Sequence, residues 1–474
     1  MAITKRGIKL KSDYSFSARS KRLVFLLLPT RLSVFLFRRF IDDNRERNAL
    51  VAAKFMVDTT SVYPTRFYRL LPKFLKFSLR LSGVDLPSNY LNFLSQSLVQ
   101  TRRTPSSRQK VRQDAIIETK KLPWQLLNPQ GWKLLSLALS GFGLIRAGTI
   151  ARKNCLKSAL NEISLDTASE RTMNLAICGL LESRRFDEAR SCIEKCSKSL
   201  SSEVVSNVYG TYLELMKQPR LHISAIINKI TTPADRLFSH LITGKNIALV
   251  APGVIKTDSG TEIDAHDTVV RIKFHGKSAM SAEKLVGRRC DITSHNEDSL
   301  TVASGNQKVS ASLLDNANDL KLFIAKKGDF KSIGALPVRV MKTWPPTFLT
   351  TGTSGTLILF DLLTASPKKL KMFGFDFYTK REQYNHEILS LYSSKKFIKS
   401  YGLRKNEFEF TFSQLGSVRI ANAHIGHDLK SDFLLIKNLY ELSGLIDGTP
   451  EVLALLNLTA DEYDLKLEEM LGDW

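Results

Sequence analysis

From residue 245 onward, short apolar segments alternate with stretches of helical pattern, and this alternation limits the chain to few folds. Five segments rich in valine, isoleucine, leucine and phenylalanine are expected to form strands: residues 245–253, 267–274, 290–296, 320–326 and 370–376. An apolar helix is expected between the last two, at residues 355–365. Strands that alternate with helices are typical of a doubly wound α/β sheet of the Rossmann-like kind, so we expect this fold.

Ligands of doubly wound sheets bind in the crevice beyond the carboxyl ends of the strands. The predicted strand ends carry glycine, lysine, asparagine and aromatic residues: Pro252-Gly253, Lys273-Phe274, His295-Asn296 and Phe375 to Tyr378. The last of these continues as GFDFYTKREQYNHE, which places Tyr378 and Tyr384 on a charged loop directly after a strand. We therefore expect one binding crevice with these two tyrosines at its rim.

The loop after the first strand, APGVIKTDSG, has neither the glycine spacing of a dinucleotide site nor the lysine of a P-loop. The helix at 355–365 is a better candidate for binding phosphate, because Thr351, Thr353 and Ser354 stand directly before it. Hydroxyl groups and free N–H groups at a helix N-terminus bind anions. The same residues would also serve as an ordinary helix cap, and the sequence alone leaves both roles open.

A histidine near the end of the chain is the candidate general base. His427 lies on the loop that enters an apolar helix, in the segment NAHIGHDLKSDFLLIKNLYELSGLI. Asp428 or Asp432 could orient its imidazole, because a neighbouring carboxylate fixes the ring of a histidine that acts as a base. His386 and His424 compete for the same role.

The formal net charge of +23 is unevenly distributed. Residues 1–121 contain 25 lysines and arginines against 8 aspartates and glutamates, so they carry +17 of it. A positive field confined to one end favours an anionic partner, either lipid headgroups or nucleic acid. The alternative is a basic domain that its charge keeps soluble. The 43% hydrophobic and 24% charged residues are ordinary for a globular protein and argue against a disordered chain.

No segment of the sequence has the length of a membrane-spanning helix, which needs about 20 apolar residues. Residues 22–40 are interrupted by Pro29 and Arg31, and residues 134–145 are too few. The first of these segments is rich in phenylalanine and arginine, which suits the membrane interface as well as a packed helix. The five cysteines are odd in number and lack zinc-site spacing, so we expect buried thiols, no disulfides and a reducing compartment.

The chain is expected to consist of a basic region, a helical region, the α/β domain and an acidic tail, at residues 1–121, 122–240, 241–446 and 447–474. The polar residues 100–114 are expected to be a linker or an exposed loop. A tetratricopeptide-like helical hairpin is expected at 174–196, with another helix at 201–219, and it could be a docking surface or a spacer. Thr459 and Glu462 predict a capped helix in the tail.

Three segments of the α/β region resemble sialyltransferases of both the eukaryotic and the bacterial type. Residues 244–274 followed by 283–296 are similar to the large donor-binding motif of the eukaryotic type, most specifically through IDAHDTVVR and VGRR. Residues 352–378 are similar to the small motif, and match the bacterial type through TSG and GFDFY. AHIGHDLKSD, residues 423–432, resembles the segment with the catalytic histidine. The resemblance covers residues 244–446 and implies a glycosyltransferase domain of the GT-A-variant kind.

The resemblance also implies roles for individual residues. His427 matches the general base that deprotonates the acceptor hydroxyl, while Tyr378 and Tyr384 match two tyrosines that hydrogen-bond the departing phosphate. The residues implied in donor binding are Gly253, Lys273, Asn296, Thr353, Ser354, Gly355 and Gly374. No metal and no cofactor are implied, because neutral phenols and a helix N-terminus take the place of the metal.

The sequence departs from the family pattern at several positions. Pro252 and Lys273 stand where the families have asparagines, although a lysine can bind the same phosphate as a point charge. The cysteines that link the two motifs in the eukaryotic type are absent, with Ala248 and Pro367 near their positions. This agrees with a cytoplasmic protein rather than one in the Golgi lumen.

Two features next to the motifs have structural interpretations. Arg271 is expected to form an ion pair with Asp264 or Asp267 rather than to take part in catalysis. The long polar stretch between Tyr384 and His424 is expected to be a lid that orders over the donor.

The expected function is that of a metal-independent, inverting glycosyltransferase. It would transfer sialic acid, or the similar 2-keto sugar acid Kdo, from a CMP-linked donor to a glycan or lipid-linked acceptor. The basic residues 1–121 would hold it on an anionic membrane surface, so we expect a cytoplasmic protein, peripheral at the inner face of a membrane, with no nucleic-acid partner. The alternative is a non-catalytic basic scaffold with a degenerate nucleotide-binding domain, which binds nucleic acid or a membrane.

Overall fold

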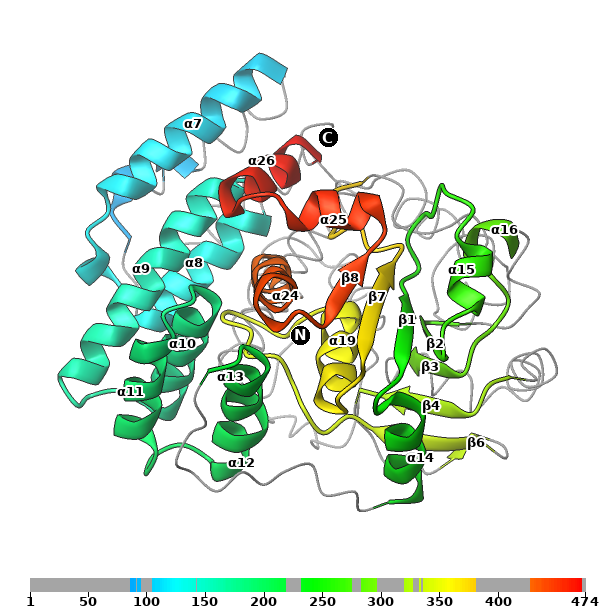
Figure 1. Ribbon diagram of the computed structural model, residues 1–474. Coiled ribbons are helices and arrows are strands. Elements are labelled where there is room, and N and C mark those ends of the chain that lie inside the picture. The colour runs from blue at the N-terminus through cyan, green and yellow to red at the C-terminus, as the bar shows by residue number, and fades with distance from the viewer. Residues whose placement is uncertain are drawn as a thin grey trace, which may run out of the picture.

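The structure is a computed structural model in which an α/β part and a helical part share one core (Figure 1). It describes residues 86–90, 92–94, 105–141, 143–218, 232–274, 283–295, 319–326, 332–333, 336–380 and 427–470. The predictions for residues 22–40, for His386 and His424, and for the stretch between them lie outside these residues.

In the described part of the chain, eight strands form one sheet. They are β1 (Asn246–Val250), β2 (Thr268–Ile272), β3 (Ile292–His295), β4 (Leu322–Ala325), β5 (Ser332–Ile333), β6 (Leu336–Val340), β7 (Lys369–Phe373) and β8 (Ile446–Gly448). Their order is β5-β6-β4-β3-β2-β1-β7-β8, and every pair is parallel except β5 with β6. The protein therefore has an α/β Rossmann-like fold. All five predicted strands are confirmed, while the sequence analysis missed β5, β6 and β8.

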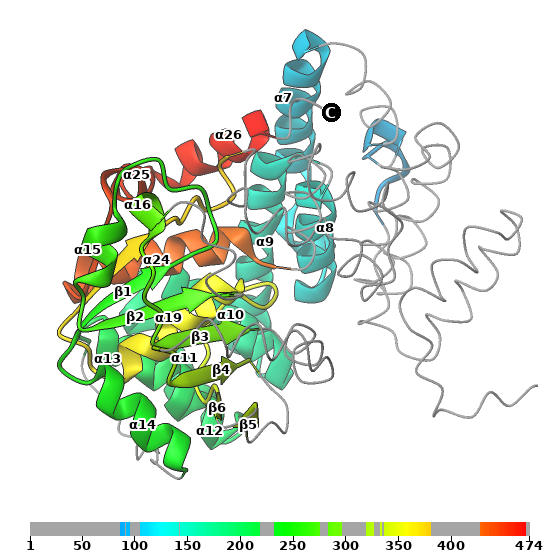
Figure 2. The same ribbon diagram turned by 90° about the vertical axis from the view of Figure 1, so that its right-hand side faces the viewer.

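Both faces of the sheet are buried, and β1 shows how alternate residues serve the two faces. Ile247 and Leu249 belong to the large core that includes helix α19 (Ser354–Thr364), whereas Ala248 and Val250 pack with Ile263 on the opposite face. That opposite face is covered by α15 (Gly260–Asp264) and α16 (Glu283–Val286), as Figure 2 shows. A strand covered on both faces is apolar along its whole length, which explains the continuous runs of apolar residues in the sequence.

The helices of the helical part lie on the side of α19 that faces away from the sheet (Figures 1 and 2). They are α7 (Pro105–Lys121), α8 (Pro129–Gly141), α9 (Ile145–Ser164), α10 (Glu170–Glu182), α11 (Phe186–Cys196), α12 (Ser202–Val204) and α13 (Thr211–Leu215), with a π-helical turn at Val205–Gly210 between the last two. Helices α10 and α11 form the predicted hairpin. The remaining helices of the α/β part are α14 (Pro233–Ile242), α24 (Leu429–Ser443) and α25 (Pro450–Leu456).

The acidic tail contains α26 (Ala460–Met470), and it packs against α9 and α24 of the same chain. The predicted cap is confirmed: the N–H of Glu462 donates to Thr459 Oγ1 at 3.2 Å, and the N–H of Thr459 donates to Glu462 Oε2 at 2.7 Å. On the inner side of the helix, Asp464 accepts from Lys430 at 2.6 Å, and Arg146 donates to Glu468 at 2.7 Å. These contacts make the tail part of the folded body.

The linker or exposed loop expected at residues 100–114 is wrong over the described residues. Helix α7 starts at Pro105 and buries Val111 and Ala115 against the core. Proline is compatible with the first turn of a helix, where its missing N–H has no intrahelical partner. The five cysteines are free and buried as predicted, and burial raises the pKa of each thiol.

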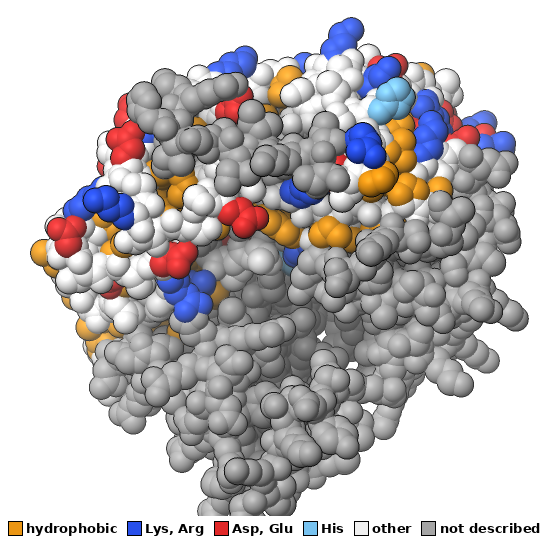
Figure 3. All heavy atoms as spheres, turned by 90° about the horizontal axis from the view of Figure 1, so that it is seen from below, with side chains coloured by type: hydrophobic (Ala, Val, Ile, Leu, Met, Phe, Trp, Pro, Cys, Tyr) orange, Lys and Arg blue, Asp and Glu red, His pale blue; other side chains and the backbone are white. Residues whose placement is uncertain are grey.

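Among the described residues, no helix is long and apolar enough to cross a membrane. The apolar residues 134–145 fall mostly in α8, where Leu135 and Leu139 are fully buried in the core. On the face seen from below, the described lysines and arginines stand beside aspartates and glutamates (Figure 3). The excess positive charge of residues 1–121 falls largely outside the described residues.

A buried network of charged residues joins the helical part to the α/β part. Arg152 on α9 donates to both carboxylate oxygens of Asp428 at 2.9 and 3.0 Å, to Glu182 Oε1 on α10 at 2.9 Å, and to Ser431 Oγ at 2.6 Å. Burial alone would raise the pKa of Asp428, but Arg152 and the N–H groups of Ser431 and Leu349 lower it. The network therefore fixes the first turn of α24 on the helices.

We predict that Arg152→Ala lowers the free energy of unfolding by about 3 to 5 kcal/mol, because it leaves two buried carboxylates without their cation. Lys153→Ala is the matched control: this lysine is exposed on the same helix, so its removal should change stability by no more than about 0.5 kcal/mol. Urea denaturation of both variants measures the difference. Equal stability of the two would show that the network is dispensable.

Candidate functional site

A pocket of about 250 Å³ lies at the carboxyl ends of β1 and β7, where the strand order reverses direction. This is the topological switch point at which doubly wound sheets bind ligands. The predicted site residues that line it are Gly253, Lys273, Thr353, Ser354, Gly355, Gly374, Tyr378 and His427. Asn296 and Tyr384 lie outside the described residues. The pocket therefore brings together predicted residues from five separate segments, three of which are predicted strand ends.

The chain segments that follow β1 and β7 approach each other so closely that only glycine fits at positions 253 and 374. A side chain on Gly253 would collide with the carbonyl oxygen of Gly374, and one on Gly374 would lie 2.8 Å from the carbonyl oxygen of Ala251. Gly374 also has a φ of +69°, which glycine adopts without strain. These two glycines shape the floor of the pocket, which is a structural reason for their positions independent of any ligand.

Three residues with side chains adopt left-handed backbone conformations in the pocket: Lys273 (φ 59°), Phe377 (φ 48°) and Tyr378 (φ 62°). The other described examples directly follow helix ends, where this conformation is common: Asp166, Arg184, Lys217 and Ser366. Non-glycine residues held in this region cost on the order of 1 kcal/mol or more each, and such strain concentrates at functional sites. The backbone thus supports the assignment of this pocket as the functional site.

The N-terminus of α19 forms one wall of the pocket. Thr353 is its N-cap residue, and Ser354 and Gly355 begin the helix. The N–H of Thr353 donates to Asp432 Oδ2 at 2.8 Å, whereas the N–H groups of Ser354 and Gly355 have no intrahelical acceptor. A helix end of this kind offers N–H donors and a positive dipole to an anion. Gly355 also lets Phe375 approach to within 3.0 Å of the position that a Cβ would take.

The first turn of α24 holds the loop before α19 in place. Asp428 accepts from the N–H of Leu349 at 2.7 Å, and Ser431 Oγ accepts from the N–H of Phe348 at 2.9 Å. Asp428 also caps its own helix by accepting from the N–H of Ser431. The expectation that Asp428 orients the imidazole of His427 is wrong, because its carboxylate faces Arg152 and the loop instead.

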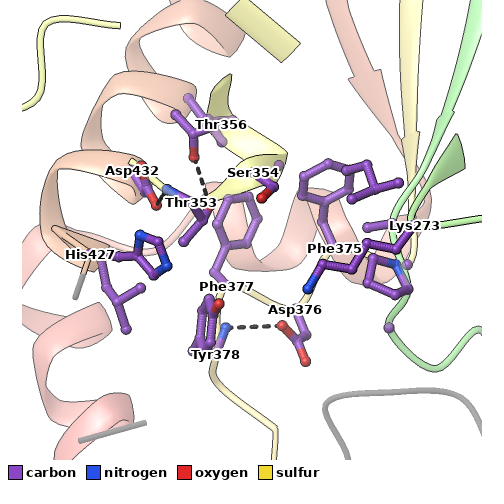
Figure 4. A pocket seen from close by; sticks show the side chains of 18 of the residues that line it. Lys273, Thr353, Ser354, Thr356, Phe375, Asp376, Phe377, Tyr378, His427 and Asp432 are labelled. Atoms are coloured by element: carbon purple, nitrogen blue, oxygen red, sulfur yellow. Dashed lines mark hydrogen bonds between the residues drawn. The ribbon is translucent and has the colours of Figure 1, made fainter. Parts of the chain in front are cut away.

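His427 lies directly before that turn and is half-buried at the pocket wall. In Figure 4, His427 and Asp432 lie on one side of the pocket and Lys273 on the other, with Tyr378 and Asp376 between them. His427 also borders a smaller cavity of about 20 Å³ between the start of α24 and helices α8 and α9. The helical part thus contributes to the surroundings of the imidazole.

Two lysines make part of the pocket positive. Lys273 follows β2, and Lys326 follows β4, so both stand at the carboxyl edge of the sheet. Lys326 obeys the same strand-end rule as Lys273, and the predicted strand at 320–326 included it, yet the sequence analysis did not select it. Together with the N-terminus of α19, the lysines favour a ligand that carries a phosphate or a carboxylate.

Asp432 on α24 is a buried carboxyl group at the pocket, 4% exposed. Burial raises its pKa to about 7, although hydrogen bonds from Thr353 and Thr356 lower it in part. Its Oδ1 is buried and accepts no hydrogen bond from the described residues. Near neutral pH this group therefore exchanges a proton, a property typical of functional sites.

A tyrosine from the acidic tail reaches the pocket as well. Tyr463 on α26 is 1% exposed, and its hydroxyl donates to the carbonyl oxygen of Phe377 at 2.9 Å. Burial raises the pKa of this phenol well above its usual value, so it remains neutral. Sequence reasoning missed it because nothing in the tail's acidic pattern indicates a contact with a strand end 86 residues earlier.

The IDAHDTVVR and VGRR segments bind each other and do not line the pocket. Asp264 accepts from the N–H groups of Arg288 and Arg289 at 2.8 and 2.9 Å, and Gly287 (φ +69°) lets the chain pass close to its carboxylate. Arg271 donates to the carbonyl oxygens of Arg289 and Val286, and lies 3.9 Å from Asp264. The predicted ion pair of Arg271 with Asp264 is confirmed.

Comparison with known protein families found no family model that matches this chain, and comparison with curated proteins found no match.

We predict that Asp432→Asn changes how stability depends on pH. The carboxyl ionises near 3.8 when unfolded and near 7 when folded. The stability that its neutral form provides is therefore complete below about pH 4 and is lost as pH rises through 7. Relative to the variant, the wild type should lose roughly 2 to 3 kcal/mol of unfolding free energy between pH 5 and pH 8.

Asparagine keeps an oxygen that can accept from Thr353, so the variant removes only the ionisation. Asp258→Asn, at an exposed loop position, is the control and should leave the pH dependence unchanged. Urea denaturation across this pH range measures both. A constant difference between wild type and Asp432→Asn would contradict the raised pKa.

Proposed function

We propose that the protein is a metal-independent, inverting glycosyltransferase of the sialyltransferase kind, with a catalytic domain of the GT-A-variant type. The donor would be a CMP-linked 2-keto sugar acid, sialic acid or Kdo, and the acceptor a glycan or a glycolipid. The observation that carries the proposal is one pocket at the switch point of the sheet, where an imidazole, a phenol, two lysines and a helix N-terminus meet. These groups match the chemical needs of phosphate departure from a nucleotide-linked sugar.

Each group has a defined task in the proposed reaction. His427 removes the proton of the acceptor hydroxyl as its oxygen attacks the anomeric carbon. The bond from that carbon to the phosphate oxygen breaks on the opposite face, so the configuration inverts. Tyr378, the N–H groups of Ser354 and Gly355, and the charge of Lys273 stabilise the phosphate of the departing CMP.

The basic residues 1–121 would hold the enzyme at an anionic membrane surface on the cytoplasmic side, close to a lipid-linked acceptor. This part of the proposal comes from the uneven charge of the sequence, since these residues carry +17. The positive charge fits nucleic acid equally well, but the proposed reaction needs a glycan acceptor, and a lipid-linked glycan would place that acceptor at a membrane surface.

We predict that the protein releases CMP from CMP-sialic acid or from CMP-Kdo in the presence of EDTA and a glycolipid extract. His427→Ala should lower the rate by about 10²- to 10⁴-fold, the usual contribution of a general base. His240→Ala, an exposed histidine on α14, is the control and should keep the wild-type rate. No release from either donor would favour the non-catalytic scaffold.

We predict further that Tyr378→Phe lowers kcat by about 10²-fold, because it removes one donor to the departing phosphate and keeps the ring. Tyr440→Phe is the matched control, since Tyr440 is a half-buried tyrosine on α24 outside the pocket. Steady-state CMP release measures both variants. An unchanged kcat for Tyr378→Phe would remove Tyr378 from the proposed mechanism.

A further inference from the structure

The turn that carries Tyr378 needs outside support to keep its shape. Phe377 and Tyr378 both have positive φ values, and neither is glycine. Local hydrogen bonds give part of the support: Asp376 Oδ1 accepts from the N–H of Tyr378 at 3.0 Å, and the carbonyl oxygen of Asp376 accepts from the N–H of Thr379 at 2.8 Å. Two consecutive strained residues persist only where the surroundings determine them.

The other support comes from α26. The hydroxyl of Tyr463 donates to the carbonyl oxygen of Phe377, the peptide group that precedes Tyr378. The ring of Tyr463 stacks on Phe433 with centroids 4.0 Å apart, and Phe433 meets the ring of Phe377 edge-on at 5.9 Å. Tyr463 thus holds the backbone of Phe377 directly, and it supports the Phe377 ring only through Phe433.

Helix α26 is itself fixed on two sides, so it can transmit this support. Asp464, the next residue, accepts from Lys430 on α24 at 2.6 Å and from Thr149 on α9 at 2.8 Å. One turn further, Glu468 accepts from Arg146 at 2.7 Å. Both carboxylates are buried and bonded, so the helix has little freedom to shift along α9.

We propose that Tyr463 is a positioning residue of the active site, which holds the phenol of Tyr378 in the geometry required to bind the departing phosphate. The inference rests on the proposed function and extends it to the C-terminal helix. The Tyr463 hydroxyl donates to the peptide group between Phe377 and Tyr378, so its loss displaces Tyr378 while the phenol of Tyr378 itself stays in the pocket. Small displacements of a catalytic group have large effects on rate, because its contact counts most in the transition state.

Tyr463→Phe tests this proposal, because phenylalanine keeps the stacking on Phe433 and loses only the hydroxyl. We expect kcat for CMP release to fall by about 10- to 100-fold, with the KM of the donor changed much less. Amide hydrogen exchange supplies a second measurement that needs no enzymatic activity. The amides of Tyr378 and Thr379 should exchange about fivefold faster, the factor that corresponds to one lost hydrogen bond.

Tyr90→Phe is the matched control. The hydroxyl of Tyr90 is buried and lies 2.8 Å from Thr119 Oγ1, outside the pocket, so this variant also loses one buried hydroxyl contact. It should keep both the wild-type kcat and the wild-type exchange at residues 378–379. If Tyr463→Phe behaves like Tyr90→Phe in both measurements, Tyr463 has no positioning role.

The two proposals fail in distinguishable ways. If the wild type releases no CMP from either donor, the proposed function fails, while the exchange measurement still decides whether Tyr463 holds the turn. If the wild type is active and Tyr463→Phe keeps its kcat, the positioning role is wrong and the proposed function stands. A fall in kcat together with faster exchange supports both.

Discussion

The site depends on the buried ion pairs that the guanidinium of Arg152 forms with Glu182 and Asp428. Bonded to Glu182 and Asp428, the guanidinium fixes the first turn of α24, and Asp428 and Ser431 in turn hold the loop that leads into α19. A buried cation of this kind tolerates no missing partner, because each carboxylate left unpaired would carry a large desolvation cost. The charge network therefore determines where His427 and the N-terminus of α19 lie relative to each other.

This arrangement gives the helical part a role beyond that of a spacer. Helix α9 supplies Arg152 to the network and contacts α26, whose Tyr463 reaches the strained turn after β7. Segments that precede and follow the strands of the sheet in the sequence thus support one pocket built on that sheet. Proteins commonly store backbone strain at a functional site and stabilise it with the surrounding structure, and the residues Phe377 and Tyr378 fit that pattern.

Much of the site could be predicted because parallel strands end at one edge of a sheet. Gly253, Lys273 and Gly374 lie at the ends of predicted strands and Tyr378 follows one, and they meet in one pocket as expected. The role of Asp428 was predicted wrongly, because its partner lies far away in the sequence. Asp428 stands next to His427 in the sequence, but its partner Arg152 is 276 residues away, and no local pattern indicates that pairing.

The sequence by itself determined the α/β fold, the edge of the sheet that carries the pocket, and the helices at 174–196, because periodic apolar residues and strand ends are local signals. The tertiary structure decided which charges pair in the core, that polar residues 105–114 form a packed helix, and that the acidic tail delivers Tyr463 to the pocket. These features arise from contacts between distant segments. Their energies depend on burial and geometry, which exist only once the chain has folded.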